Sequence, residues 1–234
     1  MRKTTFVYSS LLLTAVMLQT PATIAANIRA NVSNGETIYN QGKGDAMACS
    51  GCHGEKALGM DVMEAPRLAN VGQIYLIKQL DDYADGKRND PGNGAVMNDI
   101  AKSLSEQDRF DVSAYLDTLE YATEPSDLKA LKAEGKKIGS VVDGKSIMTK
   151  GIKPQVPACQ DCHGLSGRAQ NVPAIHYQKY VYLVNQLKRY RDGTRSNDKQ
   201  IYKDGIMRGI AKKLSDKDIE DIAAYLTTVT NPNP

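Results

Sequence analysis

Apolar residues recur at helical spacing in two stretches of the chain, and each stretch is followed by a glycine. In the first, Ile77, Leu80 and Ala84 share one helical face, and Gly86 is placed to end the helix. The second repeats this arrangement and ends before Gly193. A shorter helix is expected to begin 37 residues before each of them. The predicted long helices are Gln73–Ala84 and Tyr182–Arg191, and the predicted shorter ones are Glu36–Gln41 and Lys145–Lys150.

Two further helices are predicted where "SEQD" and "SDKD" precede an apolar pattern. A serine followed three residues later by an acidic residue is typical of a capping box, so Ser105 and Ser215 are the expected N-caps. One face of each helix should be buried. The residues expected on it are Val112, Tyr115, Leu116 and Leu119 in the first helix, and Ile219, Ile222, Ala223, Leu226 and Val229 in the second. No strand pattern of similar quality occurs, so the predicted fold class is all-α.

The halves of the chain are copies of one another. "IYLIKQLDDYADGKR" corresponds to "VYLVNQLKRYRDGTR", and "MNDIAKSLSEQDRFDVSAYL" to "MRGIAKKLSDKDIEDIAAYL", at an offset of 107 to 110 residues. Since this period is a domain length, the sequence predicts one small domain duplicated. The expected domains are residues 27–121 and 138–234, joined by a linker at 122–137. Because a domain of this size buries only a modest hydrophobic core, we expect a bound group to complete that core.

The N-terminal segment has a different pattern. Arg2 and Lys3 precede the apolar run "FVYSSLLLTAVML", which is followed by small residues in "PATIAA". This is the layout of a secretory signal peptide, and the run is about half a membrane span long. The alternative is a retained N-terminal anchor. Residues 1–26 are therefore predicted to be a signal peptide cleaved after Ala25 or Ala26, which leaves an exported, soluble protein.

Composition and charge narrow the class of partner. The chain is 41% hydrophobic, with two Phe and no Trp, which is typical of a soluble globular protein. Removal of the first 26 residues removes two basic groups and no acidic ones, so the formal charge falls from +3 to +1. The basic clusters "KRYRDGTR" and "LKALKAEGKK" are interpreted as solvated faces. No nucleic-acid partner is expected.

All four cysteines lie in two Cys-x-x-Cys pairs, each followed directly by His and Gly, in "ACSGCHG" and "ACQDCHG". In an exported protein, disulfides are the ordinary expectation. A redox dithiol needs no histidine in that place, and zinc would need two more ligands per site, whereas the chain has one other histidine, His176. His176 is interpreted as an ordinary surface or hydrogen-bonded residue.

Covalent haem accounts for every cysteine. Two thiols add to the two vinyl groups of one porphyrin, and the adjacent histidine reaches the iron. The sequence therefore predicts two haem c groups. The residues expected to hold them are Cys49, Cys52, Cys159 and Cys162 as covalent attachments, with His53 and His163 as iron ligands.

The sixth iron ligand decides between an electron carrier and a catalyst, because methionine sulfur closes the site. Met97 and Met207 each lie 44 residues after the histidine of their own motif, just before "IA" and "LS" elements present in both copies. Met60, Met63, Met47 and Met148 have no such match and are interpreted as packing residues. Met97 and Met207 are therefore the predicted sixth ligands.

Taken together, these motifs resemble the dihaem cytochrome c4 family, periplasmic proteins of two tandem class I cytochrome c domains. The resemblance rests on the paired "AC..CHG" motifs, the "QL" helices running into "DGKR" and "DGTR", and the "M..IA..LS..D" segments followed by "AYL". It implies His/Met ligation of both haems and single-electron transfer from a membrane quinol-oxidising complex or dehydrogenase to a terminal oxidase. It also implies a periplasmic location, allows peripheral membrane association, and implies no small-molecule substrate.

The resemblance further implies roles for residues around the haems. Pro66 and Pro173 occupy the places of the proline whose carbonyl accepts the Nδ1 proton of the iron-bound histidine. Arg88 and Arg195 are candidate contacts of the haem propionates.

These features leave three candidate functions. The leading hypothesis is an electron carrier without substrate turnover, and therefore not an enzyme. The second is the dihaem subunit of a periplasmic dehydrogenase, such as one paired with a sulfide-oxidising flavoprotein. The third is a dihaem enzyme, which needs one open or unusually ligated haem, and the matched Met97 and Met207 give no sign of one.

Overall fold

The computed structural model describes residues 29–120, 124–163, 172–198 and 205–229. The predicted signal peptide, residues 1–26, lies outside the described residues. Within them there is no strand, and three isolated pairs of residues form β-bridges. Among these same residues, no helix is both long and apolar enough to cross a membrane. The prediction of an all-α fold is confirmed.

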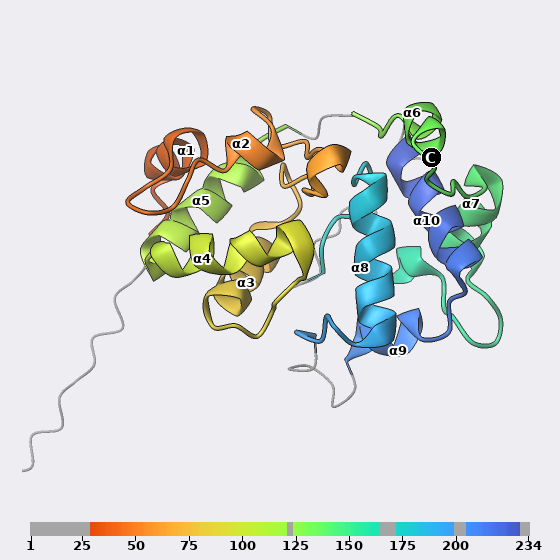
Figure 1. Ribbon diagram of the computed structural model, residues 1–234. Helices are drawn as coiled ribbons and strands as arrows, with labels where there is room; N and C mark the ends of the chain where they lie inside the picture. The colour runs from red at the N-terminus through yellow and green to blue at the C-terminus, as the bar shows by residue number, and fades with distance from the viewer. Residues whose placement is uncertain (1–28, 121–123, 164–171, 199–204, 230–234) are drawn as a thin grey trace, which may run out of the picture.

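Two groups of helices lie side by side, and each contains one copy of the repeat (Figure 1). The first group comprises α1 (Val32–Gln41), α2 (Ser50–His53), η1 (Asp61–Met63), α3 (Gln73–Ala84), η2 (Gly92–Ala95), α4 (Val96–Ser103) and α5 (Glu106–Thr118). The second group comprises α6 (Leu128–Ala133), α7 (Val141–Lys150), η3 (Cys159–Asp161), α8 (Tyr180–Asp192), α9 (Ile206–Ala211) and α10 (Asp216–Thr228).

The predicted helices are confirmed, with some shifts at their ends. Helix α3 has the expected bounds, whereas α1 and α7 begin four residues earlier than expected. The cause is an N-cap that the apolar pattern does not reveal: the side chains of Asn31 and Ser140 accept hydrogen bonds from the third helical N–H. Helices α5 and α10 begin with the predicted capping boxes at Ser105 and Ser215.

In each domain, the first long helix crosses the last one at a glycine. A Cβ atom at Gly35 of α1 would overlap the carbonyl oxygen of Asp111, and one at Gly144 of α7 would overlap that of Asp221. The same two aspartates, both buried, accept hydrogen bonds from the N-cap backbones of the crossing helices, Asn31 N at 2.9 Å and Ser140 N at 2.7 Å. Close helix packing therefore depends on a missing side chain and a buried carboxylate in both copies.

Each domain has its own apolar core, and the predicted stripes lie in it. In α5, Val112 and Leu116 are buried while Tyr115 and Leu119 pack at the edge. All five residues expected on the buried face of α10 are buried, and the last of them, Val229, directly follows the helix. The first core further contains Ile38, Tyr39, Leu76 and Leu104, and the second Ile147, Met148, Leu183 and Leu214.

Much of the segment expected to be a linker packs on the second domain. Leu131 of α6 is 6% exposed and belongs to the second core. Ser126 N donates to Thr227 Oγ1 at 2.8 Å, and Ser126 Oγ accepts from Tyr180 N at 2.9 Å. The basic cluster "LKALKAEGKK" thus includes a buried anchor as well as a solvated face.

Helix α8 lies between the two cores and carries much of the domain contact (Figure 1). At its start, Val181 N donates to Asp61 Oδ1 at 2.9 Å, and one turn later Asn185 Nδ2 donates to Glu64 Oε2 at 2.9 Å. Arg189 Nη2 donates to the Pro91 carbonyl at 3.1 Å. Backbone and side-chain groups of α8 therefore hold the segments of the first domain that flank its candidate haem site.

Candidate functional site

The two Cys-x-x-Cys-His motifs adopt closely similar turns. In both, the backbone N–H of the histidine donates to the carbonyl of the first cysteine, His53 to Cys49 and His163 to Cys159, each at 2.9 Å. This turn is helix α2 in the first domain and the shorter η3 in the second. Each turn places the thiol side chains and the imidazole of its motif on one cavity.

Both histidines are oriented by the predicted prolines. His53 Nδ1 lies 2.9 Å from the Pro66 carbonyl oxygen, and His163 Nδ1 lies 3.0 Å from that of Pro173. A carbonyl oxygen only accepts, so Nδ1 carries the proton and Nε2 keeps its lone pair for a metal. Burial lowers the pKa of both imidazoles, and the carbonyl bond opposes this only in part. Both rings are therefore held neutral, as iron ligation requires.

The four cysteines are not joined by disulfides. Burial raises the pKa of the Cys49 thiol to about 11 and that of Cys159 to about 11. A redox dithiol is activated by the opposite shift, which lowers a thiol pKa. Among the described residues, no group of three His, Cys, Asp or Glu side chains could hold a metal ion. The geometry thus favours thioether attachment over the zinc and dithiol alternatives.

Met97 and Met207 occupy equivalent places, each the second residue of its helix, α4 and α9. Both are half-buried and line the cavity that the histidines reach. The start of α9 is fixed because Asp198 Oδ2 accepts from Met207 N at 2.8 Å. Met47 and Met63 also line this cavity, so a place on the cavity wall does not by itself separate the candidate ligands from the packing methionines.

The cavity has a volume of about 640 Å³ and extends through both domains. Its walls are mainly apolar, and on each side they include core residues of the last helix, Val112 and Leu116 in α5 and Ile222 and Leu226 in α10. All twelve site residues predicted from the sequence line it. In each domain the cavity is apolar, with the two thiols and a neutral imidazole on one wall and a methionine and a buried arginine on other walls. This arrangement fits the donor set and the shape of haem c.

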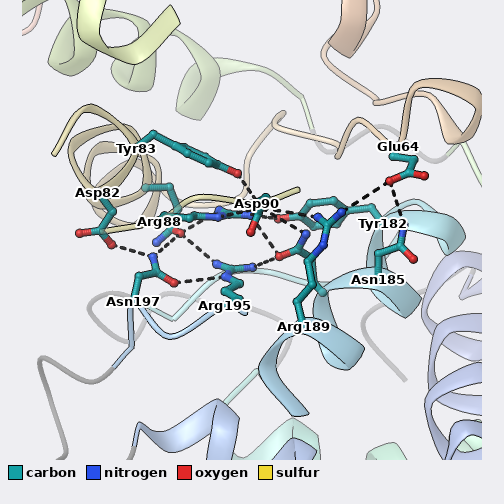
Figure 2. A network of polar contacts seen from close by, with 12 residues as sticks. Glu64, Asp82, Tyr83, Arg88, Asp90, Tyr182, Asn185, Arg189, Arg195 and Asn197 are labelled. Carbon is teal, nitrogen blue, oxygen red and sulfur yellow. Dashed lines mark hydrogen bonds and ion pairs between the residues drawn. The ribbon is translucent and has the colours of Figure 1, made fainter. Parts of the chain in front are cut away.

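Arg88 and Arg195 are both buried and meet at the domain interface (Figure 2). Each donates to the glutamine of its own domain, Arg88 to Gln79 at 2.9 Å and Arg195 to Gln186 at 2.6 Å. Each also donates to the other domain's glutamine, at 3.1 Å and 2.9 Å respectively. The cluster "KRYRDGTR" is therefore not a solvated face along its whole length, since Arg195 belongs to this buried network.

The network follows the internal repeat closely. Each arginine lies over a tyrosine of its own domain, Arg88 over Tyr83 and Arg195 over Tyr190, at 4.5 Å from the ring centroid in both cases. The two copies differ at the next contact: the Arg88 Nε–H donates to Asp90 at 3.0 Å, whereas that of Arg195 donates to Asn197 at 3.2 Å. The cluster thus has two buried guanidinium groups, of which Arg88 is bonded directly to a carboxylate, that of Asp90 (Figure 2).

Asp90 should stabilise the fold in a pH-dependent way. Burial alone would raise the pKa of this carboxyl, but the charges of Arg88 and Arg195, with hydrogen bonds from Arg88 and Tyr83, lower it to about 2. A depressed carboxyl pKa stabilises the fold above the unfolded pKa of about 3.9, and this contribution is lost as the pH falls through about 2.

We therefore expect Asp90→Asn to reduce the free energy of unfolding by about 2 kcal/mol near neutral pH, and by progressively less between about pH 4 and pH 2. Urea titrations of both proteins at several pH values measure this difference. A difference that stays constant down to pH 2 would contradict the assigned role of the carboxylate.

Several residues of the site were not predicted from the sequence. Gln79 and Gln186 stand in the repeated "QL" element, so conservation between the two copies was the available signal. Asp90, Arg67 and Gln178 differ from their counterparts in the other copy and gave no such signal. His176 is 5% exposed, so of its two interpretations the surface one is excluded.

Comparison with known proteins agrees with this geometry. The family model for cytochrome c matches twice in tandem, at residues 32–120 and 141–230. A cytochrome c4 of Pseudomonas aeruginosa is 33% identical over 79% of this chain and 85% of that protein. A protein of Stutzerimonas stutzeri described as "Thiosulfate dehydrogenase electron acceptor" is 32% identical over 89% of this chain and 92% of its own length.

Solved structures show the same tandem arrangement. Reduced recombinant cytochrome c4 from Pseudomonas stutzeri superposes with a TM-score of 0.67 at 29% identity, over 85% of this chain and 98% of that one. The thiosulfate dehydrogenase TsdBA from Marichromatium purpuratum gives a TM-score of 0.69 at 28% identity, and the match covers 85% of this chain and 40% of the larger protein. From the tandem family match, the relatives and the shared fold, the chain belongs to the dihaem cytochrome c4 family and carries two covalently bound haem c groups.

Proposed function

We propose that the protein is an exported, periplasmic electron carrier without substrate turnover, with His53 and Met97 ligating the first haem iron and His163 and Met207 the second. The observation that carries this proposal is the matched placement of histidine and methionine along one cavity in both domains. Each haem supplies one-electron exchange at its iron when bound. Two closed iron sites leave no open position for a small substrate.

The chain's own residues prepare the sites for this task. Pro66 and Pro173 hold the imidazoles in one tautomer, and apolar side chains exclude water from the cavity walls. Cys49 and Cys159, with their partners Cys52 and Cys162, are the proposed covalent attachments. Arg88 and Arg195 are the proposed propionate contacts, since their buried charge suits an anionic group. Rigid sites of this kind keep the geometry constant when the charge on the iron changes.

The distribution of charge supports two different partners for the two domains. Residues 27–121 contain nine Lys and Arg against 15 Asp and Glu, whereas residues 122–234 contain 19 against 12. The net charge of the mature chain is near zero because the opposite charges of the two domains almost cancel. A donor and an acceptor of opposite surface charge could therefore approach opposite ends of the molecule. We propose a membrane quinol-oxidising complex or a dehydrogenase as donor and a terminal oxidase as acceptor.

A second candidate function is supported by the comparisons. Two relatives, from Stutzerimonas stutzeri and Thiomonas intermedia, are described as electron acceptors of thiosulfate dehydrogenase. The corresponding proposal is that this chain accepts electrons from such a periplasmic dehydrogenase and remains a carrier. It differs from the leading proposal in the donor, not in the haem sites.

Stopped-flow spectroscopy can separate these proposals. The reduced holoprotein, mixed with membranes from its own organism, should be oxidised rapidly and in a cyanide-sensitive way, and the rate should fall with added salt because the docking is electrostatic. Inertness toward the membranes would contradict the oxidase-linked proposal. Rapid reduction of the oxidised form by thiosulfate dehydrogenase with thiosulfate, absent when either is omitted, would identify the second donor.

A further inference from the structure

The residues that follow Pro66 and Pro173 meet each other across the domain interface. We call these stretches, residues 66–71 and 173–178, the two proximal segments, since the proline of each orients the histidine proposed to bind iron. Ala174 N donates to the Val71 carbonyl at 3.1 Å, which joins the segments directly. The two histidine supports are therefore parts of one bonded structure.

Gln178 of the second domain holds the proximal segment of the first. Its Oε1 accepts from Arg67 N at 2.7 Å, and its Nε2 donates to the Arg67 carbonyl at 2.9 Å. Arg67 is the residue directly after Pro66. The side-chain amide of Gln178, a residue that is 5% exposed, thus satisfies both backbone groups of Arg67, beside the carbonyl that orients His53.

Arg67 of the first domain holds the proximal segment of the second. Its side chain is the largest among those that are almost completely buried, at 1% exposure. Nη2 donates to the His176 carbonyl at 2.8 Å and to the Ala174 carbonyl at 3.5 Å, while Nη1 donates to Ala69 in its own segment at 2.7 Å. Ala174 is the residue directly after Pro173, so a guanidinium from one domain fixes the support of His163 in the other.

The two cross-domain contacts, made by Gln178 and by Arg67, are not repeated between the two copies of the domain. At an offset of 107 residues, Arg67 corresponds to Ala174 and Gln178 corresponds to Val71. Each domain therefore contributes one long polar side chain at a position where its counterpart has a short apolar one. The two contributions complement each other instead of duplicating each other.

We propose that Arg67 and Gln178 form a reciprocal clasp in which each domain positions the other domain's iron-binding histidine. Gln178 fixes the Pro66 support of His53, and Arg67 fixes the Pro173 support of His163. They are positioning residues, since neither is placed on an iron atom. Removing one member leaves buried backbone groups of the opposite segment without partners, which loosens the carbonyl that it holds. This inference rests on the proposed roles of His53 and His163 as ligands.

The crossed pattern can be measured directly at the histidine rings. The chain has three histidines, so ¹⁵N-histidine labelling of the reduced holoprotein gives three ring systems to assign by NMR. Exchange of each Nδ1 proton with solvent reports how firmly its carbonyl acceptor is held. We expect Gln178→Leu to speed exchange at His53 by about fivefold or more, and Arg67→Met to do the same at His163, each with a smaller effect on the other ring.

Two matched variants sharpen the test. Gln178→Glu keeps the acceptor for Arg67 N and loses the donor to the Arg67 carbonyl, so it should give an intermediate increase at His53. Arg67→Lys keeps a buried cation and fewer donors, and it should partly restore slow exchange at His163. These conservative changes also provide folded proteins should the apolar variants unfold.

Arg189→Met is the control for general loosening of the interface. It removes another cross-domain arginine that bonds the Pro91 carbonyl and has no hydrogen bond to either proximal segment. Exchange at both rings should stay within about twofold. For the Gln178 and Arg67 variants, three results would overturn the clasp. Proton exchange could become faster at the histidine of the mutated domain alone, equally faster at both histidines, or no faster at either. Absence of haem-shifted His53 and His163 ring signals in the unsubstituted protein would instead overturn the ligand assignment.

Discussion

Met207→Ala is expected to abolish the weak red absorption band of oxidised Met/His haem in the second domain and to leave that of the first unchanged, and Met97→Ala is expected to do the reverse. The reason is that each methionine starts a helix at the cavity that the histidine of its own domain reaches. Loss of a soft sulfur ligand also lowers the reduction potential and opens an iron position to small molecules. Spectra with and without carbon monoxide measure both effects.

The other two cavity methionines provide the control for this prediction. Met47 and Met63 line the same cavity but are 55% and 36% exposed, and neither has a counterpart at the repeat-related position. Met47→Ala and Met63→Ala should therefore retain both red bands and bind no carbon monoxide. Retention of both bands in Met97→Ala or Met207→Ala would disprove the ligand assignment in that domain.

Gly144→Ala is expected to destabilise the second domain by about 3 kcal/mol or more, and Gly35→Ala should affect the first domain equally. At Gly144 a new methyl group would overlap the backbone of Asp221 and approach Tyr225 Cβ to 2.8 Å, and neither obstacle is the flexible end of a side chain. The helices α7 and α10 would have to separate. Thermal or urea unfolding, followed by far-ultraviolet circular dichroism and by the red band of each haem, measures the loss and its location.

Gly209→Ala is the matched control, because Gly209 lies in helix α9 and, apart from the local backbone of that helix, no heavy atom of the described residues lies within 4 Å of the position of a new Cβ. Alanine there should stabilise the helix by up to about 1 kcal/mol, since glycine is a poor helix former. A similar loss of stability in all three variants would show that glycine conformation, rather than the helix crossing, is responsible.

Local and repeated features were predictable from the sequence. The helix at Gln73–Ala84 and the two capping boxes follow from patterns within a single turn or helix, which depend little on the rest of the chain. The haem motifs were identified because both copies carry them, and the role of the prolines was implied by the resemblance to the cytochrome c4 family. In the structure, His53 and His163 do lie within hydrogen-bonding distance of the Pro66 and Pro173 carbonyls.

The domain interface could not be predicted in the same way. Arginine in a sequence such as "KRYRDGTR" normally indicates a solvated surface, and Arg195 is buried because the first domain packs against it. Arg67 and Gln178 are 111 residues apart in sequence, and their counterparts are Ala174 and Val71. Each of these two residues is present in one copy of the repeat and absent from the other. Neither hydrophobic periodicity nor comparison of the copies therefore indicates that they are in contact.

The broken symmetry of the interface means that the two halves can no longer replace each other. Asp82 faces Asn197 at 2.7 Å, and at the repeat-related place Arg189 faces Asp90 at 3.7 Å. Two copies of the first half would set Asp82 against Asp90, and two copies of the second would lack the Arg67 arm altogether. A duplicated chain has therefore become a heterodimer within one polypeptide, in which each half supplies interface side chains that the other half lacks.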